Sequence, residues 1–339
     1  MTQAPASIEN RVAWPWGTNE PTTRKRVVVA ATIAVLMCAT FYVIHFVNQV
    51  LDPAQPMHSD FSPVWYGAHA LREGQNPYDL IGPGMQIQSR WPALYPATAY
   101  VLALPFTLIG EKWASVLFVG VSSFLLVFGA TRDSWHRLPM FASVPFLTGI
   151  ILGQLSVIIT AVLFLPWLAV ISCAKPQIAL PMIITSKQRI LIAAVGGAVV
   201  LGISLIMLPG WPQQWLGFVR HTPQFRPPIV NFGGFLILLI LLRWRRPETW
   251  IIATMAVMPQ SWYPYNWIVL LAVPNTYREA MLLTIISSAG GLAGEYAVYG
   301  MPRLAMWQVG GAFSVAFAYL PATLMILGRP NIRDAQRLR

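Results

Sequence analysis

The sequence predicts an all-α integral membrane protein. Hydrophobic residues make up 56% of its 339 residues and charged residues only 10%, whereas a soluble domain carries roughly 25% charged residues. The mean hydropathy of +0.56 agrees with this bias. Apolar runs follow one another along most of the chain, and many approach the length that crosses a bilayer about 30 Å thick. This composition argues against a soluble enzyme, a disordered tail or a disulfide scaffold.

The first predicted membrane helix covers residues 27–51 and directly follows the basic cluster at 24–26. The apolar region of a signal peptide spans only about 7–15 residues and leads to a small-residue cleavage site. This run is longer and is followed by Asp52 and Pro53. We therefore expect a retained membrane helix at this position.

The later apolar runs predict one polytopic membrane domain over residues 27–327, with cytoplasmic tails at 1–26 and 328–339. We expect about ten to twelve membrane helices in a bundle, with an amphipathic outer loop after the first. Several runs are short, and tilted, broken or re-entrant helices are tolerated where they line a protein cavity. After the first helix, the predicted segments are 96–110, 112–130, 138–152, 154–173, 176–186, 189–209, 232–242, 248–258, 262–274, 279–298 and 304–327.

The formal net charge of +11 comes mostly from basic residues in short connectors between apolar runs. A nucleic-acid surface would gather these residues into one patch, whereas basic connectors mark the cytoplasmic ends of membrane helices. We therefore expect both termini inside and the segments 52–95 and 210–231 outside. This orientation puts Glu111-Lys112 inside, and it leaves the loop with Arg132 and Arg137 outside as an exception.

The first outer segment predicts a short amphipathic helix that lies in the membrane interface. Asp60 stands at its start, where it either caps the helix or serves as a reactive carboxylate. Aromatic residues are frequent in this segment, and they either stack on sugar rings or belong to the interfacial belt. The residues spaced for one face of the helix are Phe61, Trp65, Tyr66, Ala68 and Leu71.

The second outer segment contains the cationic cluster Arg220, His221 and Arg226. Its prolines prevent it from being helical throughout. Arginine and histidine at the outer end of a helix can hold a phosphate group by charge-assisted hydrogen bonds. The alternative is that they contact lipid headgroups.

Polar residues also interrupt the apolar runs. Gln154 stands between two such runs, and Lys175 and Gln177 begin a short apolar helix. An ionisable residue in such surroundings is a functional-site hypothesis by default. The alternative for Lys175 is that its ammonium group snorkels to a membrane interface.

The sequence has none of the common motifs of soluble enzymes, such as a phosphate-binding glycine loop, HExxH or GxSxG. Cys38 and Cys173 lie within apolar runs and are too few for a disulfide framework. No dense carboxylate cluster is available for a divalent ion. We therefore expect neither a metal nor a cofactor. Asp52 and Asp79 are the carboxylates that leave a metal ion open as an alternative.

Short motifs spread over about residues 27–275 resemble a known family when taken in order. They are Asp60-Phe61 with Trp65-Tyr66, Leu94-Tyr95-Pro96, Leu104-Pro105-Phe106, Gly153-Gln154, Lys175-Pro176-Gln177, Trp211 with Trp215, and Pro264-Tyr265-Asn266-Trp267. This series resembles the polytopic membrane glycosyltransferases of family 87, which include bacterial polyprenyl-phosphate-mannose-dependent mannosyltransferases.

The resemblance implies a GT-C fold in the bacterial cytoplasmic membrane, with the active site toward the periplasm or cell exterior. The implied reaction moves a sugar, mannose in the named relatives, from a polyprenyl-phosphate donor to a lipid or glycan acceptor. Asp60 would be the general base, and the donor phosphate would be bound by Lys175, Arg220, His221 and Arg226. The expected sugar and acceptor contacts are Trp65, Tyr66, Tyr95, Gln154 and Gln177. Nucleic acid is not an expected partner.

Two further classes of protein stay open. A polytopic transporter or lipid flippase places ionisable residues near the bilayer midplane and often has two related halves. A non-catalytic membrane assembly subunit needs no reactive residue. The most distinctive polar residues lie in the outer segments and no related halves are visible, so the sequence favours the transferase.

Overall fold

A computed structural model describes residues 21–51, 59–89, 92–220 and 225–331. The described chain is mostly helical, as predicted. Five of its helices are long and apolar enough to cross a membrane. They are α1 (Thr23–Leu51), α5 (Glu111–Ala130), α9 (Lys187–Met207), α12 (Tyr277–Val298) and the continuous stretch of α13 (Arg303–Ser314), the π-helical turn η8 (Val315–Tyr319) and α14 (Leu320–Leu327).

The remaining predicted segments form shorter helices. The ten to twelve membrane helices expected therefore outnumber the five described helices that are long and apolar enough to cross a membrane. Proline explains many of these breaks, because it starts a helix readily but interrupts one from within. The shorter helices are α2 (Ser62–Arg72), α3 (Pro77–Leu80), α4 (Ala97–Ala103), η1 (Leu104–Leu108), η2 (Leu138–Ala142), α6 (Val144–Ile151), α7 (Leu155–Thr160), η3 (Ala161–Leu163), η4 (Pro166–Ala174), α8 (Pro176–Ile183), α10 (Trp211–Arg220), η5 (Pro228–Val230), η6 (Gly234–Arg243), α11 (Pro247–Val257) and η7 (Pro264–Ala272). A two-stranded parallel ladder joins β1 (Ile81–Gly82) to β2 (Ile87–Gln88).

Helices α1 and α5 pack antiparallel along their length. Near the start of α1, the Arg26 guanidinium donates to the Phe128 carbonyl at 2.5 Å and lies 4.1 Å from the centre of the Phe128 ring. Near the other end, the Lys112 ammonium lies 4.7 Å from the centre of the Tyr42 ring. The basic start of α1 therefore lies beside the end of α5.

This packing corrects the predicted sides of two charged connectors. Glu111-Lys112 lies at the same end of the bundle as the end of α1, whereas the loop with Arg137 lies at the Arg26 end. The prediction was wrong because it assumed that the run 96–110 crosses. That run forms only α4 and η1, which are too short to cross a membrane. The chain therefore returns to the end of the bundle from which it came.

Helix α2 also differs from its prediction, because it is covered by protein. It packs on α4, η1 and α5, and both Trp65 and Ala68 are buried. The approach to α4 is close: a Cβ atom on Gly67 would come within 2.5 Å of the Tyr100 ring. An interfacial helix would keep one polar face in water, whereas most of the surface of α2 is covered.

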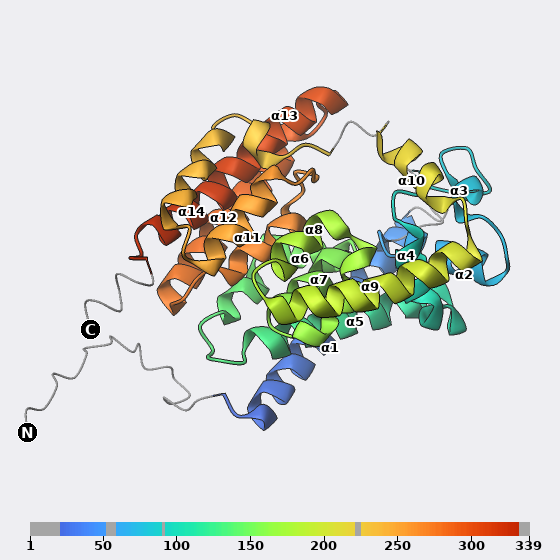
Figure 1. The fold of residues 1–339 in the computed structure, drawn as a ribbon, viewed down its shortest axis with the longest axis horizontal. Helices are drawn as coiled ribbons and strands as arrows, with labels where there is room; N and C mark the ends of the chain where they lie inside the picture. Colours follow the sequence, from blue (N-terminus) through green and yellow to red (C-terminus); the bar gives the residue numbers. More distant parts are fainter. Residues whose placement is uncertain (1–20, 52–58, 90–91, 221–224, 332–339) are drawn as a thin grey trace, which may run out of the picture.

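The two segments predicted to lie outside, hereafter the outer segments, lie side by side. Helix α10 is held beside α3 because the Asn76 amide donates to Gln214 Oε1 at 3.2 Å, and the two helices are neighbours in Figure 1. The Trp215 indole donates to the Leu94 carbonyl at 2.9 Å. Helix α10 ends at Arg220, and the chain from 225 to 231 is largely irregular, as the prolines predict.

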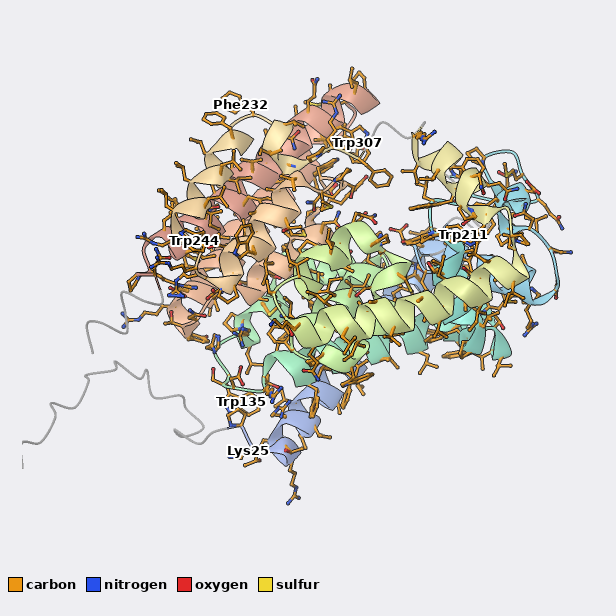
Figure 2. All side chains as sticks on the ribbon, in the orientation of Figure 1. Lys25, Trp135, Trp211, Phe232, Trp244 and Trp307 are labelled. Carbon is orange, nitrogen blue, oxygen red and sulfur yellow. The ribbon has the colours of Figure 1, made fainter. Side chains whose placement is uncertain are left out.

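The opposite end of the bundle gathers basic side chains. Figure 2 shows Lys25 and Trp135 toward the bottom and Trp244 at the left, whereas Trp211 lies at the right and Trp307 near the top. There the Arg243 guanidinium donates to the Leu327 carbonyl at 2.7 Å. The structure thus separates a basic end from the end formed by the outer segments.

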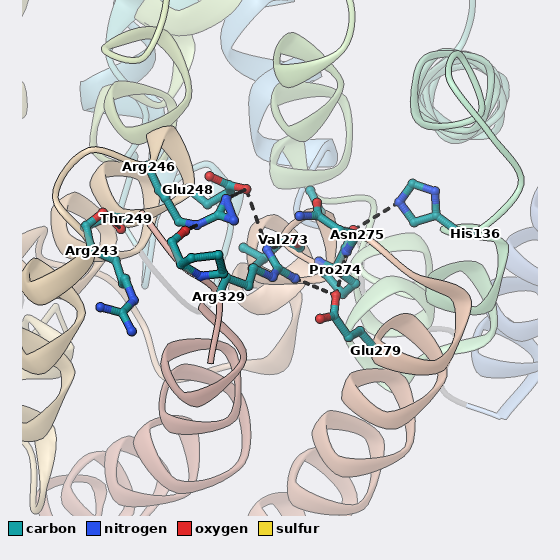
Figure 3. Close-up of polar contacts among 12 residues, drawn as sticks. His136, Arg243, Arg246, Glu248, Thr249, Val273, Pro274, Asn275, Glu279 and Arg329 are labelled. Carbon is teal, nitrogen blue, oxygen red and sulfur yellow. Dashed lines mark hydrogen bonds and ion pairs between the residues drawn. The ribbon is translucent and has the colours of Figure 1, made fainter. Parts of the chain in front are cut away.

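Arg329 joins three helices at the basic end (Figure 3). Its guanidinium lies 2.5 Å from the Glu279 carboxylate, 3.6 Å from the Glu248 carboxylate and 3.2 Å from the Val273 carbonyl. Glu248 and Glu279 stand in the first turns of α11 and α12, where the helix dipole favours negative charge. Arg329 follows α14 directly, so it ties the end of α14 to the starts of α11 and α12.

We predict that Arg329→Met lowers the free energy of unfolding by about 2–3 kcal/mol, because it leaves the partly buried Glu279 carboxylate without its cation and leaves Glu248 with Arg246 alone. Arg245→Met is the matched control, since Arg245 is exposed and lies over the Trp244 ring; its cost should stay within about 0.5 kcal/mol. Unfolding in detergent micelles measures both variants. Equal losses in the two would contradict a specific role for Arg329.

Candidate functional site

A cavity of about 950 Å³ opens between the outer segments and the C-terminal helices. Its walls come from the turn before α2, the loop 83–96, the α6–α7 turn, the start of α8, α10 and the segment before η7. It is lined by Ser59, Asp60, Pro63, Pro83, Gly84, Gln88, Ser89, Pro92, Leu94, Tyr95, Pro96, Leu152, Gln154, Ala174, Lys175, Pro176, Gln177, Trp215, Val219, Phe225, Pro259, Ser261, Tyr263, Tyr265 and Trp307.

Asp60 reaches this cavity from the turn that precedes α2. Phe61, and not Asp60, is the N-cap residue of α2, and the first N–H of the helix, from Ser62, donates to Ser59 Oγ. The Asp60 carboxylate instead accepts a hydrogen bond from the Gln154 amide through Oδ2. The helix-cap interpretation of Asp60 is therefore wrong, and its carboxylate is directed to a polar contact at the cavity wall.

Lys175 stands between η4 and α8 and is only 8% exposed. Its ammonium donates to Gln154 Oε1 and to Ser156 Oγ, both at 3.0 Å. It also lies 5.0 Å from the centre of the Tyr265 ring, within the range of a cation–π contact. Lys175 thus faces an internal cavity, and the alternative that it snorkels to a membrane interface is wrong.

The contacts of Lys175 continue into a buried polar network. Ser156 Oγ donates to Asn266 Oδ1 at 3.2 Å, and the Asn266 amide donates to Ser261 Oγ at 3.0 Å. The Ser261 hydroxyl lies 3.0 Å from the Tyr265 hydroxyl. Buried polar groups are costly unless they are hydrogen-bonded. This network meets that requirement and holds Lys175 in one position.

Burial shifts the protonation of both charged groups toward neutrality. It raises the pKa of the Asp60 carboxyl, while the nearby Lys175 charge and the Gln154 hydrogen bond act in the opposite direction. Burial lowers the pKa of Lys175 to about 8, against the pull of the Asp60 carboxylate. A carboxyl and an amine with opposite shifts in one cavity are typical of functional sites.

The structure brings only some of the predicted sugar contacts to this cavity. Tyr95 and Gln177 line it together with Gln154. Trp65 and Tyr66 do not, because they belong to the covered helix α2, where the Trp65 indole donates to the Phe106 carbonyl at 3.0 Å. Their assignment to sugar binding in this cavity is therefore not supported.

The predicted cationic cluster does not gather around Lys175 in the described chain. Arg220 is exposed at the end of α10 and is absent from the cavity wall. Arg226 lines a small neighbouring cavity that shares Ser261 and Trp307 with the larger one. His221 lies outside the described residues, so its prediction stays open.

Some lining and network residues were not assigned a role from the sequence. Ser156 and Ser261 are short polar residues in apolar surroundings, without a periodic signal of their own. Trp307 comes from α13, far along the chain. Tyr265 and Asn266 belong to a motif of the family resemblance, and that motif was the available signal for them.

The described residues offer no group of three or more His, Cys, Asp or Glu side chains that could hold a metal ion. Asp79 is exposed and accepts a hydrogen bond from the Asn76 amide at 2.7 Å. Asp52 lies outside the described residues. The charged side chains on the described wall of the cavity are Asp60 and Lys175.

We predict that Gly153→Ala lowers the free energy of unfolding by about 1–2 kcal/mol, because Gly153 has a φ of +60° that favours glycine. The new Cβ would also come within 3.1 Å of Ser59 Cβ. Gly202→Ala is the control: it lies within α9, its Cβ would have nothing within 4 Å, and alanine there should be neutral or stabilising by up to about 1 kcal/mol. Thermal unfolding in detergent measures both, and a neutral Gly153→Ala would contradict the prediction.

Comparison with known proteins does not assign the chain to a family. No family model matches the chain, and neither a curated protein nor a solved structure matches it. The function of the cavity therefore has to be inferred from the residues that line it.

Proposed function

We propose that this protein is a membrane glycosyltransferase of GT-C type. It moves a sugar, mannose by the family resemblance, from a polyprenyl-phosphate donor to a lipid or glycan acceptor on the outer face of the bacterial cytoplasmic membrane. The observation that supports this most is the Asp60 carboxylate at the wall of a cavity of about 950 Å³, with the Lys175 ammonium on the same wall. A base and a cation facing one space are what transfer from a sugar phosphate requires.

Asp60 is the general base in this proposal. Its carboxylate accepts the proton of an acceptor hydroxyl at a distance of about 2.6–3.2 Å. The acceptor oxygen then bonds to the anomeric carbon of the sugar, and the bond between that carbon and the phosphate oxygen breaks. Burial raises the pKa of Asp60, which makes its carboxylate a stronger base than an exposed one.

Lys175 balances the negative charge on the departing phosphate. In this buried position a single ammonium stabilises developing charge more than it would in water. A polyprenyl-phosphate donor leaves as a monophosphate ester, so its charge is modest. Arg226 lines the adjoining small cavity, which shares Ser261 and Trp307 with the larger one, and in this proposal it acts on a phosphate at the junction of the two spaces.

The proposed orientation follows from the two ends of the bundle. Arg26, Arg243 and Arg329 lie at the end away from the outer segments. Basic residues concentrate on the cytoplasmic side of membrane proteins. The cavity, at the other end, would then open toward the periplasm or cell exterior, where lipid-linked sugars are used.

We predict that Asp60→Asn lowers transfer by about 100-fold or more, because asparagine keeps the size of the side chain but cannot accept the proton. Membranes that contain the variant are assayed for transfer of radiolabelled sugar from polyprenyl-phosphate mannose. Asp79→Asn is the control and should keep its activity, since Asp79 does not line the cavity. Full activity in Asp60→Asn would refute its role as the base. Absence of transfer by the native protein, together with flux of the lipid across the membrane, would favour the transporter.

We predict a bell-shaped dependence of kcat/KM on pH. Activity falls at low pH as Asp60 gains a proton, and this fall begins above the usual carboxyl range because burial raises the pKa of Asp60. Activity falls again above about pH 8 as Lys175 loses its proton. Lys175→Met should abolish the alkaline fall and move the acid fall to higher pH, because the carboxylate loses a nearby positive charge. An unchanged alkaline fall would show that another group causes it.

A further inference from the structure

We propose that Gln154 is a positioning residue, whose backbone turn fixes Asp60 in place and whose amide couples Asp60 to Lys175. This assignment replaces the sugar contact that the sequence predicted for Gln154. It rests on the proposed function in so far as Asp60 is a base. The contacts that carry it come from the turn between α6 and α7.

The turn 152–154 packs directly against the residues that precede α2. The Asp60 backbone N–H donates to the Leu152 carbonyl at 2.7 Å. Gly153 adopts a φ of +60°, and the space beside it is closed by Ser59. The Gln154 backbone N–H donates to the Gly149 carbonyl at 2.8 Å, so the turn is itself anchored to α6. Asp60 is therefore held by its backbone as well as by its carboxylate.

The two ends of the Gln154 amide suit its two charged neighbours. Nε2 donates to the Asp60 carboxylate, and Oε1 accepts from the Lys175 ammonium at 3.0 Å. The opposite orientation of the amide would set a donor against a donor and an acceptor against an acceptor. Gln154 is 3% exposed and both of its polar atoms are engaged within the protein. These contacts favour a positioning role over a sugar contact.

The contact also selects which carboxylate oxygen can act. Gln154 engages Oδ2 of Asp60, so the proton of an acceptor hydroxyl would go to Oδ1. The Gln154 amide links the Asp60 carboxylate and the Lys175 ammonium by one hydrogen bond to each. The Asp60 charge also acts on Tyr95 and Tyr265, which line the same cavity.

Infrared titration of the Asp60 carboxyl in the full-length purified protein tests this role. Asp60→Asn identifies the carboxyl band. In Gln154→Met, which keeps the length of the side chain but has no amide, Asp60 should titrate about one pH unit higher, because its carboxylate loses a hydrogen-bond donor. Gln154→Glu should raise it at least as far, because a second acid would stand beside Asp60. Gln177→Met is the control, since Gln177 lines the same cavity, and it should leave the Asp60 titration unchanged.

Kinetics separate a positioning role from a sugar contact. Loss of positioning should lower kcat by about 10- to 100-fold with KM near its native value, and the acid fall of kcat/KM should move with the Asp60 titration. A lost sugar contact would raise KM instead. If the native protein is active and the Asp60 titration is unchanged in both folded Gln154 variants, the role of Gln154 is refuted while the proposed function stands. A shifted titration in a native protein that transfers no sugar would refute the proposed function, while the coupling through Gln154 would stand.

Discussion

The hydrogen bonds of Gln154 to Asp60 and Lys175 are the contact on which the cavity depends. Charged groups inside an apolar bundle are costly unless other groups compensate them. Here one amide compensates both charges. It also joins the turn before α2, the α6–α7 turn and the η4–α8 junction, which are far apart in the sequence. The same contact that makes the charges tolerable therefore sets the shape of the cavity wall.

The broken helices explain why polar side chains can meet at this place. An unbroken membrane helix satisfies its own backbone and presents mainly apolar side chains. The breaks at Gly153, Lys175 and Pro264 lie where α6 passes into α7, η4 into α8, and the chain into η7. Irregular backbone is tolerated within a membrane protein where it lines a cavity. The breaks thus supply the polar network, and the network in turn stabilises the breaks.

The sequence predicted the helical class and several residues of the cavity, for reasons that particular residues show. Gln154 and Lys175 were recognised because they are polar residues beside apolar runs, and Asp60 because it begins the short helix of the first outer segment, where the family resemblance places the base. The structure gathers all three. Ser156 gave no such signal, because short hydroxyl residues are common in membrane helices. The predicted membrane side of Glu111 and Lys112 was wrong, because the length of an apolar run alone cannot distinguish a crossing helix from the short pair α4 and η1. Packing against α1 decides that difference.

The two ends of the molecule use charge in different ways. At the basic end, Arg329 lies 2.5 Å from the Glu279 carboxylate, and this direct pair acts as a fixed tie between helices. In the cavity, a neutral amide stands between the Asp60 carboxylate and the Lys175 ammonium. This weaker coupling leaves burial as the dominant influence on both groups. In the proposed mechanism Asp60 accepts a proton in that arrangement, whereas Arg329 and Glu279 only hold helices together.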